Sequence, residues 1–198
     1  MTRFVFLLAL LLVPLSMQAG QAPAPSQPAP ANPQANPIGV AVLGFKERVA
    51  EYIKLHKEAA SKVPKVTETR DATNMQSREA ALASTIKQLR LHAKEGDVFG
   101  TDFRAVLARE VRRDFLGRSA ADRQAVMQEQ PLKMRLSVNM TYPTDKPLKT
   151  FPAQLLQKLP ELPPELEYRI VGHHIVLRDV TANLIVDVAR DIVPKIAG

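Results

Sequence analysis

Residues 166–177 read LEYRIVGHHIVL, two apolar runs separated by Gly172-His173. Runs rich in Ile, Val, Leu and Tyr favour β-strands. A two-residue connection that contains glycine is typical of a hairpin, because glycine adopts the positive φ that such turns require. The stretch therefore predicts strands at 166–171 and 175–177. A lone hairpin is marginally stable in water, so its apolar face needs further elements to cover it.

A third strand is predicted upstream, where residues 132–142 read LKMRLSVNMTY. Apolar and polar residues alternate along this segment, which is the period of a strand buried on one face. A short helix is expected between this strand and the hairpin. It begins after Thr150 and has leucines at 155, 156 and 159 on its apolar side.

Four helices are predicted before any strand. The first runs from Phe45 to Val63 with apolar residues at helical spacing, and Pro64 ends it. The others have apolar stripes or capping signals of the same kind. They are the stripe Leu82, Ile86, Leu89 and Ala93 before Gly96, the stripe Phe103, Leu107, Val111 and Phe115 before Gly117, and a segment from Ser119 to Pro131.

The last segment, Asn183 to Ile192, is interpreted as a helix because Leu184, Ile185, Val188 and Ile192 repeat at helical spacing. A strand that begins at Leu184 is the alternative. Helices followed by strands define an α+β class. We predict four N-terminal helices packed on a small, mainly antiparallel three-stranded sheet, with a short helix between strands and a C-terminal helix.

The N-terminus predicts export. Residues 1–19 have the pattern of a signal peptide, with cleavage near Ala19 or Ala22, and residues 20–38 form a Pro/Ala-rich spacer ahead of a single domain at 39–198. The expected location is periplasmic or secreted. The alternative is an uncleaved segment that tethers the chain to the inner membrane, and membrane contact is expected only in that case.

Composition narrows the partners. The chain of 198 residues has no cysteine, so neither a cysteine-linked lipid anchor nor a disulfide is available to it. Its net charge of +7 favours an anionic envelope component or a protein partner. No tryptophan is present and aromatic residues are few, so nucleic acid is not an expected partner. The oligomeric state stays open.

Three stretches resemble a group of short exported bacterial proteins of uncharacterised function. They are LPELPPELEYRIVGHHIVLRDVTANLIVD at 159–187, AKEGDVFG at 93–100 and NMTYP at 139–143. The resemblance runs from the first helix to the C-terminus. It implies one intact domain and an envelope location, and it brings no activity and no site residues.

A basic patch is the candidate binding site. Arg109, Arg112 and Arg113 fall within an arc of about 100° on the third helix, away from its apolar stripe. Arg135, from the polar side of the predicted strand, extends the set. Glu110 and Asp114 border these arginines, so the alternative is an ordinary solvated surface with its charges neutralised.

Histidines give a second, weaker candidate. His173, His174 and Asp179 are the residues that a metal site or an acid/base pair would use. Neighbouring residues on a strand point to opposite faces, and no HExxH spacing is present, so solvated turn histidines are the preferred interpretation. Asp179, Asp187 and Asp191 are interpreted as caps or surface charges.

We therefore predict a non-enzymatic envelope protein, a binding module with a basic surface. No catalytic residue and no cofactor is assigned to it. The alternative is a small metal-dependent or acid/base hydrolase built on the hairpin histidines, His173 and His174.

Overall fold

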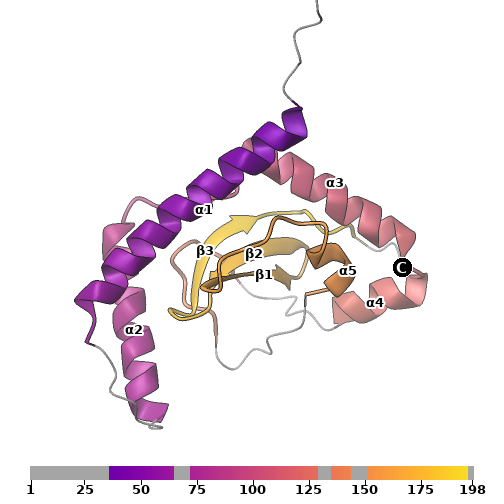
Figure 1. Ribbon diagram of the computed structural model, residues 1–198. Coiled ribbons are helices and arrows are strands. Elements are labelled where there is room, and N and C mark those ends of the chain that lie inside the picture. Colours follow the sequence, from indigo (N-terminus) through magenta and orange to yellow (C-terminus); the bar gives the residue numbers. More distant parts are fainter. Residues whose placement is uncertain (1–35, 65–71, 129–134, 144–150, 196–198) are drawn as a thin grey trace, which may run out of the picture. The chain divides into compact units, whose positions relative to one another are not determined.

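The computed structural model describes residues 36–64, 72–128, 135–143 and 151–195. Five helices and three strands lie in these ranges (Figure 1). The predicted signal peptide and residues 20–35 of the predicted spacer lie outside the described residues. The α+β class is confirmed, since the five described helices all precede a three-stranded antiparallel sheet.

Helix α1 (Pro37–Lys62) begins eight residues before Phe45, where the apolar pattern had placed its start. The Asn36 side chain accepts a hydrogen bond from the N–H of Ile38 at 3.1 Å, and Pro37 stands in the first turn, where its missing N–H costs nothing. The helix ends before Pro64, as predicted. Its buried stripe is Ala41, Phe45, Val49, Tyr52, His56 and Ala59.

The next three helices follow the predicted order. They are α2 (Ala72–Leu89), α3 (Thr101–Gly117) and α4 (Ala120–Gln128). The N–H of Asp122 donates to Ser119 Oγ at 3.1 Å, which satisfies a free donor of the first turn of α4. Helix α1 contacts both α2 and α3. The short helix α5 (Ala153–Leu156) precedes all three strands instead of lying between two of them.

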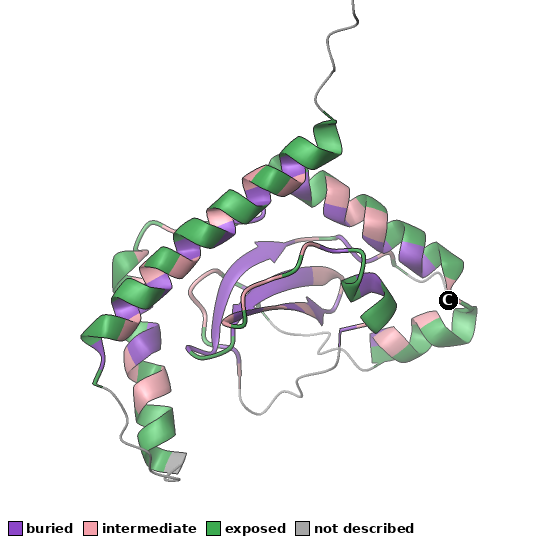
Figure 2. Ribbon diagram, in the orientation of Figure 1, coloured by how far each residue is buried: buried purple, intermediate pink, exposed green. Residues whose placement is uncertain are grey.

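The sheet has the order β1-β2-β3, with β1 (Leu166–Val171), β2 (His174–Asp179) and β3 (Leu184–Ala189). The predicted hairpin is confirmed: Val171 pairs with His174 across Gly172-His173, and Gly172 has a φ of 57°. Figure 2 shows that the strands are buried along most of their length, whereas the helices alternate between buried and exposed faces.

Two segments have a different secondary structure from the one predicted. Residues 135–143, the described part of the segment predicted as a strand at 132–142, form no strand and make one isolated bridge, between Thr141 and Leu184. Residues 184–189 of the segment interpreted as a C-terminal helix are strand β3, so the alternative interpretation was right.

An irregularity in β3 determines which way two acidic side chains point. Leu177 pairs with Asp187 and Arg178 pairs with Ile185, so Val186 is an extra residue in the ladder. Opposed residues of an antiparallel pair share a face, and Leu177 belongs to the main core. The bulge therefore turns Asp187 toward the helices. Asp179 pairs with Leu184, another residue of the main core, and faces the same way.

Each face of the sheet has its own core. The main core joins α1, α2, α3 and α5 to one face of the sheet. The rings of Phe45, Phe99 and Phe103 stack within it, and the ring centroids of Phe45 and Phe103 lie 4.0 Å apart. The opposite face is covered by the segment 135–143, which supplies Leu136 and Tyr142. Both faces are therefore buried, although the sheet has only three strands.

Candidate functional site

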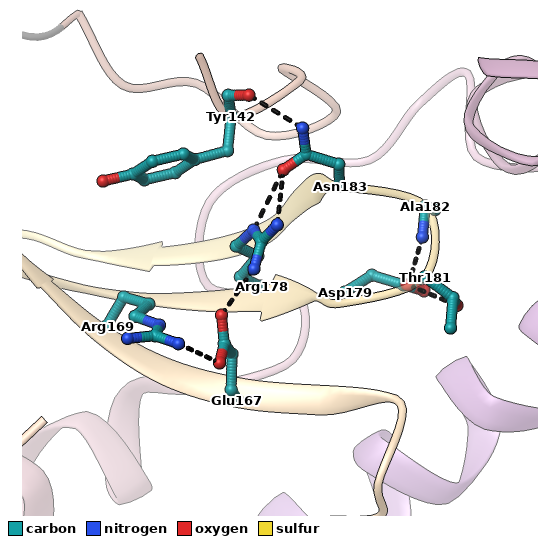
Figure 3. Close-up of polar contacts among 8 residues, drawn as sticks. All are labelled: Tyr142, Glu167, Arg169, Arg178, Asp179, Thr181, Ala182 and Asn183. Carbon is teal, nitrogen blue, oxygen red and sulfur yellow. Dashed lines mark hydrogen bonds and ion pairs between the residues drawn. The ribbon is translucent and has the colours of Figure 1, made fainter. Parts of the chain in front are cut away.

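A buried polar network joins α1 to the turn between β2 and β3. The Asp179 carboxylate is fully buried and accepts four hydrogen bonds. Tyr52 Oη donates to Oδ2 at 2.7 Å, and His56 Nδ1 lies 2.6 Å from the same oxygen. Oδ1 accepts from Thr181 Oγ1 at 3.0 Å and from the N–H of Ala182 at 2.8 Å. Figure 3 shows the contacts within the turn.

The charges in this network follow from its contacts. The hydrogen bond to Asp179 raises the pKa of His56 above its ordinary 6.5, against a lowering by burial, and the charge of Asp179 adds to the rise. Burial alone would raise the pKa of Asp179, but the hydrogen bonds from His56, Ala182 and Tyr52 outweigh it and hold that pKa below 3.8. Burial and the adjacent carboxylate raise the pKa of Tyr52, so its hydroxyl stays neutral.

The stability of the fold should therefore depend on pH through His56. A group whose pKa is raised by folding stabilises the fold fully below its unfolded pKa, near 6.5, and loses that contribution as pH rises through its folded pKa. Asp179 has a lowered pKa, and its contribution is lost as pH falls below about 3.8. We expect the free energy of unfolding, measured with urea, to decrease from pH 6 to pH 9.

The variant His56→Gln provides the control, because glutamine retains hydrogen-bonding atoms and does not titrate. Its free energy of unfolding should be lower than that of the wild type and nearly constant over the same pH range. Glu165, which raises the pKa of His56, and Arg78, which lowers it, remain in both proteins. An equal pH dependence in the two proteins would assign the effect to another group.

A substrate would have little access to the groups of this network. His56 Nε2 lies 3.5 Å from Thr181 Oγ1, but that hydroxyl donates to Asp179 instead. His56 is 6% exposed, so the ring offers little surface to a substrate. The arrangement suits a buried clasp that fixes α1 on the sheet.

A second buried carboxylate holds the loop before α3. Asp187 accepts hydrogen bonds from the N–H groups of Gly96, Val98 and Phe99 at 2.7–2.8 Å. Burial raises its pKa, and these donors oppose that shift. Arg48 also holds this loop, because it donates to the carbonyl oxygens of Val98 at 2.8 Å and Phe99 at 2.9 Å.

A third cluster lies on the opposite face of the sheet, around Arg178 (Figure 3). Its guanidinium donates to Asn183 Oδ1 at 2.7 Å and to Glu167 Oε1 at 2.6 Å, and it stacks over the ring of Tyr142 at 5.5 Å. Glu167 also binds Arg169. The Asn183 side chain donates to the carbonyl of Tyr142 at 2.9 Å, so this cluster attaches the covering segment to the sheet.

The predicted arginine patch is partly neutralised. Arg109 lies 3.1 Å from Glu110 Oε1 and Arg113 lies 3.1 Å from Glu110 Oε2. Arg112 is exposed, and no described residue forms an ion pair with it. Arg135 is also exposed, and no described contact joins it to the other three.

The hairpin histidines do not meet Asp179. His174 begins β2 and Asp179 ends it, so about 16 Å of strand separates them. His173 Nδ1 lies 3.2 Å from the carbonyl oxygen of Val193, and His174 Nδ1 accepts from the N–H of Asp191 at 3.0 Å. Among the described residues, no group of three or more His, Asp or Glu side chains is placed to hold a metal ion.

The acidic residues near the C-terminus divide into two kinds. Asp191 is exposed, as predicted for a surface charge. Asp179 and Asp187 are fully buried, so neither is the surface charge that was one of the two predicted roles, whereas Asp179 does accept the N–H of Ala182 in its own turn.

A basic row on α1 was not predicted as a site. Lys46, Lys54 and Lys57 are exposed, and none forms an ion pair with a described residue. They line a groove of about 610 Å³ between α1 and the segment 161–163, together with Phe45, Val49, Ala50, Ile53, Glu161, Leu162 and Pro163. The signal was present in the sequence, because positions 46, 54 and 57 fall within about 80° of one helix face.

No family model, curated protein or solved structure matches this chain. The resemblance to short exported bacterial proteins stays a prediction. Within the described ranges, every helix is too short or too polar to cross a membrane.

Proposed function

We propose that this chain is an exported, non-enzymatic protein of the cell envelope, a binding module whose basic surface engages an anionic partner. The observation that supports the proposal best is the lysine row Lys46, Lys54 and Lys57 beside its groove. Lysine stems lie along apolar surface while their ammonium groups stay in water, available to a negative charge.

The arrangement of the charges favours α1 over α3 as the binding surface. On α3, Glu110 forms ion pairs with two of the three arginines, whereas none of the three lysines of the α1 groove forms an ion pair with a described residue, and Glu161 is the one acidic residue that lines the groove. The acidic residues of α1 occupy the adjoining arc of the helix, and Glu58 is paired with Lys62 at 2.6 Å. The three lysines therefore outnumber the one carboxylate that lines the groove.

Charge reversal on the two helices tests this choice. A fluorescent oligoglutamate peptide should bind the wild type at low salt, with the change in anisotropy as the measurement. The triple variant Lys46→Glu, Lys54→Glu, Lys57→Glu should weaken binding at least about tenfold, because three attractive contacts become repulsive.

The matched control is Arg109→Glu, Arg112→Glu, Arg113→Glu, which lowers the net charge by the same amount. It should bind within about twofold of the wild type. Equal losses in the two variants would mean that binding follows net charge alone and would contradict a specific surface on α1.

A further inference from the structure

The groove beside the lysine row has an apolar interior as well as charged side chains. Its most deeply buried lining residues are Phe45 and Val49, which are 0% and 5% exposed. The other apolar lining residues are exposed or half-buried, and they are Ala50 and Ile53 on α1 and Leu162 and Pro163 on the facing segment. A partner that contacted the ammonium groups alone would leave this apolar surface in water.

The order of residues along α1 places the apolar surface next to two positive charges. Residues four apart on a helix form a continuous ridge. Val49, Ile53 and Lys57 form such a ridge along the groove, so two apolar side chains lead to an ammonium group. Lys54 lies three residues before Lys57 and is its neighbour on the helix surface. The groove therefore offers an apolar track that ends at a pair of lysines.

The size of the groove suits one small molecule. Its volume of about 610 Å³ lies within the usual range for small-molecule sites, about 300–1,000 Å³. From Val49 to Lys57, α1 rises about 12 Å. An extended chain of ten to twelve carbons spans about 11–13 Å, at about 1.2 Å per bond. The apolar track therefore matches the length of a medium-length acyl chain.

The burial of the apolar lining favours a single molecule over a membrane surface. A bilayer takes up apolar side chains that project from a protein, as on an amphipathic helix that lies on a membrane. Here the three lysines are exposed, whereas Phe45 and Val49 are buried beneath the groove. A single chain can enter the groove and cover this lining, but a flat bilayer would reach the lysines alone.

We propose that the α1 groove binds a single-chain anionic amphiphile of the class of a medium-chain fatty acid. Its tail lies along Val49 and Ile53, with Leu162 on the facing side, and its carboxylate lies between Lys54 and Lys57. Three lysines against Glu161 leave an excess of two positive charges in the lining, which complements an anionic head. This inference rests on the proposed function, because it names the anionic partner of the lysine groove.

The probe is dodecanoate, titrated into the full chain by calorimetry below the concentration at which it forms micelles. Hexanoate is the matched ligand, because it has the same carboxylate and six fewer methylenes. Each methylene that leaves water completely favours binding about fourfold. Dodecanoate should therefore bind at least about a hundredfold more tightly than hexanoate, even though the open groove covers only part of the chain.

Two variants test the position of the head. Lys54→Glu combined with Lys57→Glu should weaken dodecanoate binding at least about tenfold, because two attractive charges become repulsive. Lys46→Glu should weaken it less than about threefold, since Lys46 lies about 16 Å along the helix from Lys57, beyond the screening length at physiological salt. Nuclear Overhauser effects should join the tail methylenes to the methyl groups of Val49, Ile53 and Leu162.

The outcomes separate this inference from the proposed function. Equal affinities for hexanoate and dodecanoate, with oligoglutamate binding that still depends on the three lysines, would overturn the amphiphile and leave the proposed function intact. A wild type that binds neither dodecanoate nor oligoglutamate would remove both. Nuclear Overhauser effects to Phe151 and Leu156 instead would place the tail in the adjoining groove of about 680 Å³ and contradict the proposed site. Binding to phosphatidylglycerol vesicles without binding to dodecanoate would also overturn it.

Discussion

Replacement of Asp187 by alanine is expected to lower the free energy of unfolding by about 4 kcal/mol, a very large effect for a single substitution. The carboxylate is fully buried and accepts from the N–H groups of Gly96, Val98 and Phe99. Alanine leaves these donors without an acceptor, and each buried unsatisfied donor costs on the order of 1–3 kcal/mol. Urea denaturation followed by circular dichroism measures the loss.

The matched control is Asp97→Ala in the same loop. Asp97 is exposed and accepts one hydrogen bond, from the N–H of Lys94 at 2.8 Å. Its removal should cost less than about 1 kcal/mol, because water replaces the lost acceptor. If the two variants lost similar amounts, the buried carboxylate would not be what holds the loop.

The close packing of this loop explains why the Asp187→Ala substitution should have a large effect on stability. Arg48 donates to two carbonyl oxygens of the loop, and a Cβ placed on Gly100 would lie 2.7 Å from its guanidinium carbon. Gly100 also has a φ of 67°, a value that residues with a side chain rarely adopt. The loop has little freedom to move toward another acceptor when Asp187 is removed.

The sequence predicts local elements well and strand partners poorly. The hairpin at 166–177 could be predicted because its turn residues and its pairing lie in one stretch. The C-terminal strand was interpreted as a helix because Leu184, Ile185, Val188 and Ile192 recur at helical spacing. The bulge at Val186 and burial on both faces remove the alternation that identifies most strands.

The alternation at 132–142 is real, but it has a different cause. Leu136 and Tyr142 pack on the outer face of the sheet, with Met140 against them. The chain between them turns at Asn139, whose φ is 63°, a value incompatible with a continuous strand. An alternating pattern reports that one side is buried, and it does not report whether the backbone is paired.

Only the α1 side of the buried network around Asp179 could be recognised in the sequence. His56 occupies the apolar stripe of α1, four residues after Tyr52 and three before Ala59, and this position marks it as buried. Its partner Asp179 lies more than a hundred residues away, and no pattern in one sequence joins the two. The lysine row on α1 is a similar case. The sequence shows that Lys46, Lys54 and Lys57 share one helix face, but the groove beside them also depends on the distant segment 161–163.

The second large effect is expected for Asp179→Asn, which should lower the free energy of unfolding by about 3 kcal/mol at pH 6. All four contacts of this carboxylate are donors: Tyr52 and His56 on one oxygen, Thr181 and Ala182 on the other. An asparagine keeps one acceptor oxygen and presents an NH₂ group in place of the second. That NH₂ group would face the Tyr52 hydroxyl and the protonated His56 ring.

The pH dependence of this variant distinguishes the clasp from a general loss of packing. Without the carboxylate, His56 is favoured as the neutral ring, whose Nδ1 can accept from the new NH₂ group once Nε2 carries the proton. The variant should therefore become more stable from pH 6 to pH 9, opposite to the wild type. Asp191→Asn, which removes one exposed carboxylate, should follow the wild type. A uniform loss at all pH values would show that Asp179 acts through packing alone.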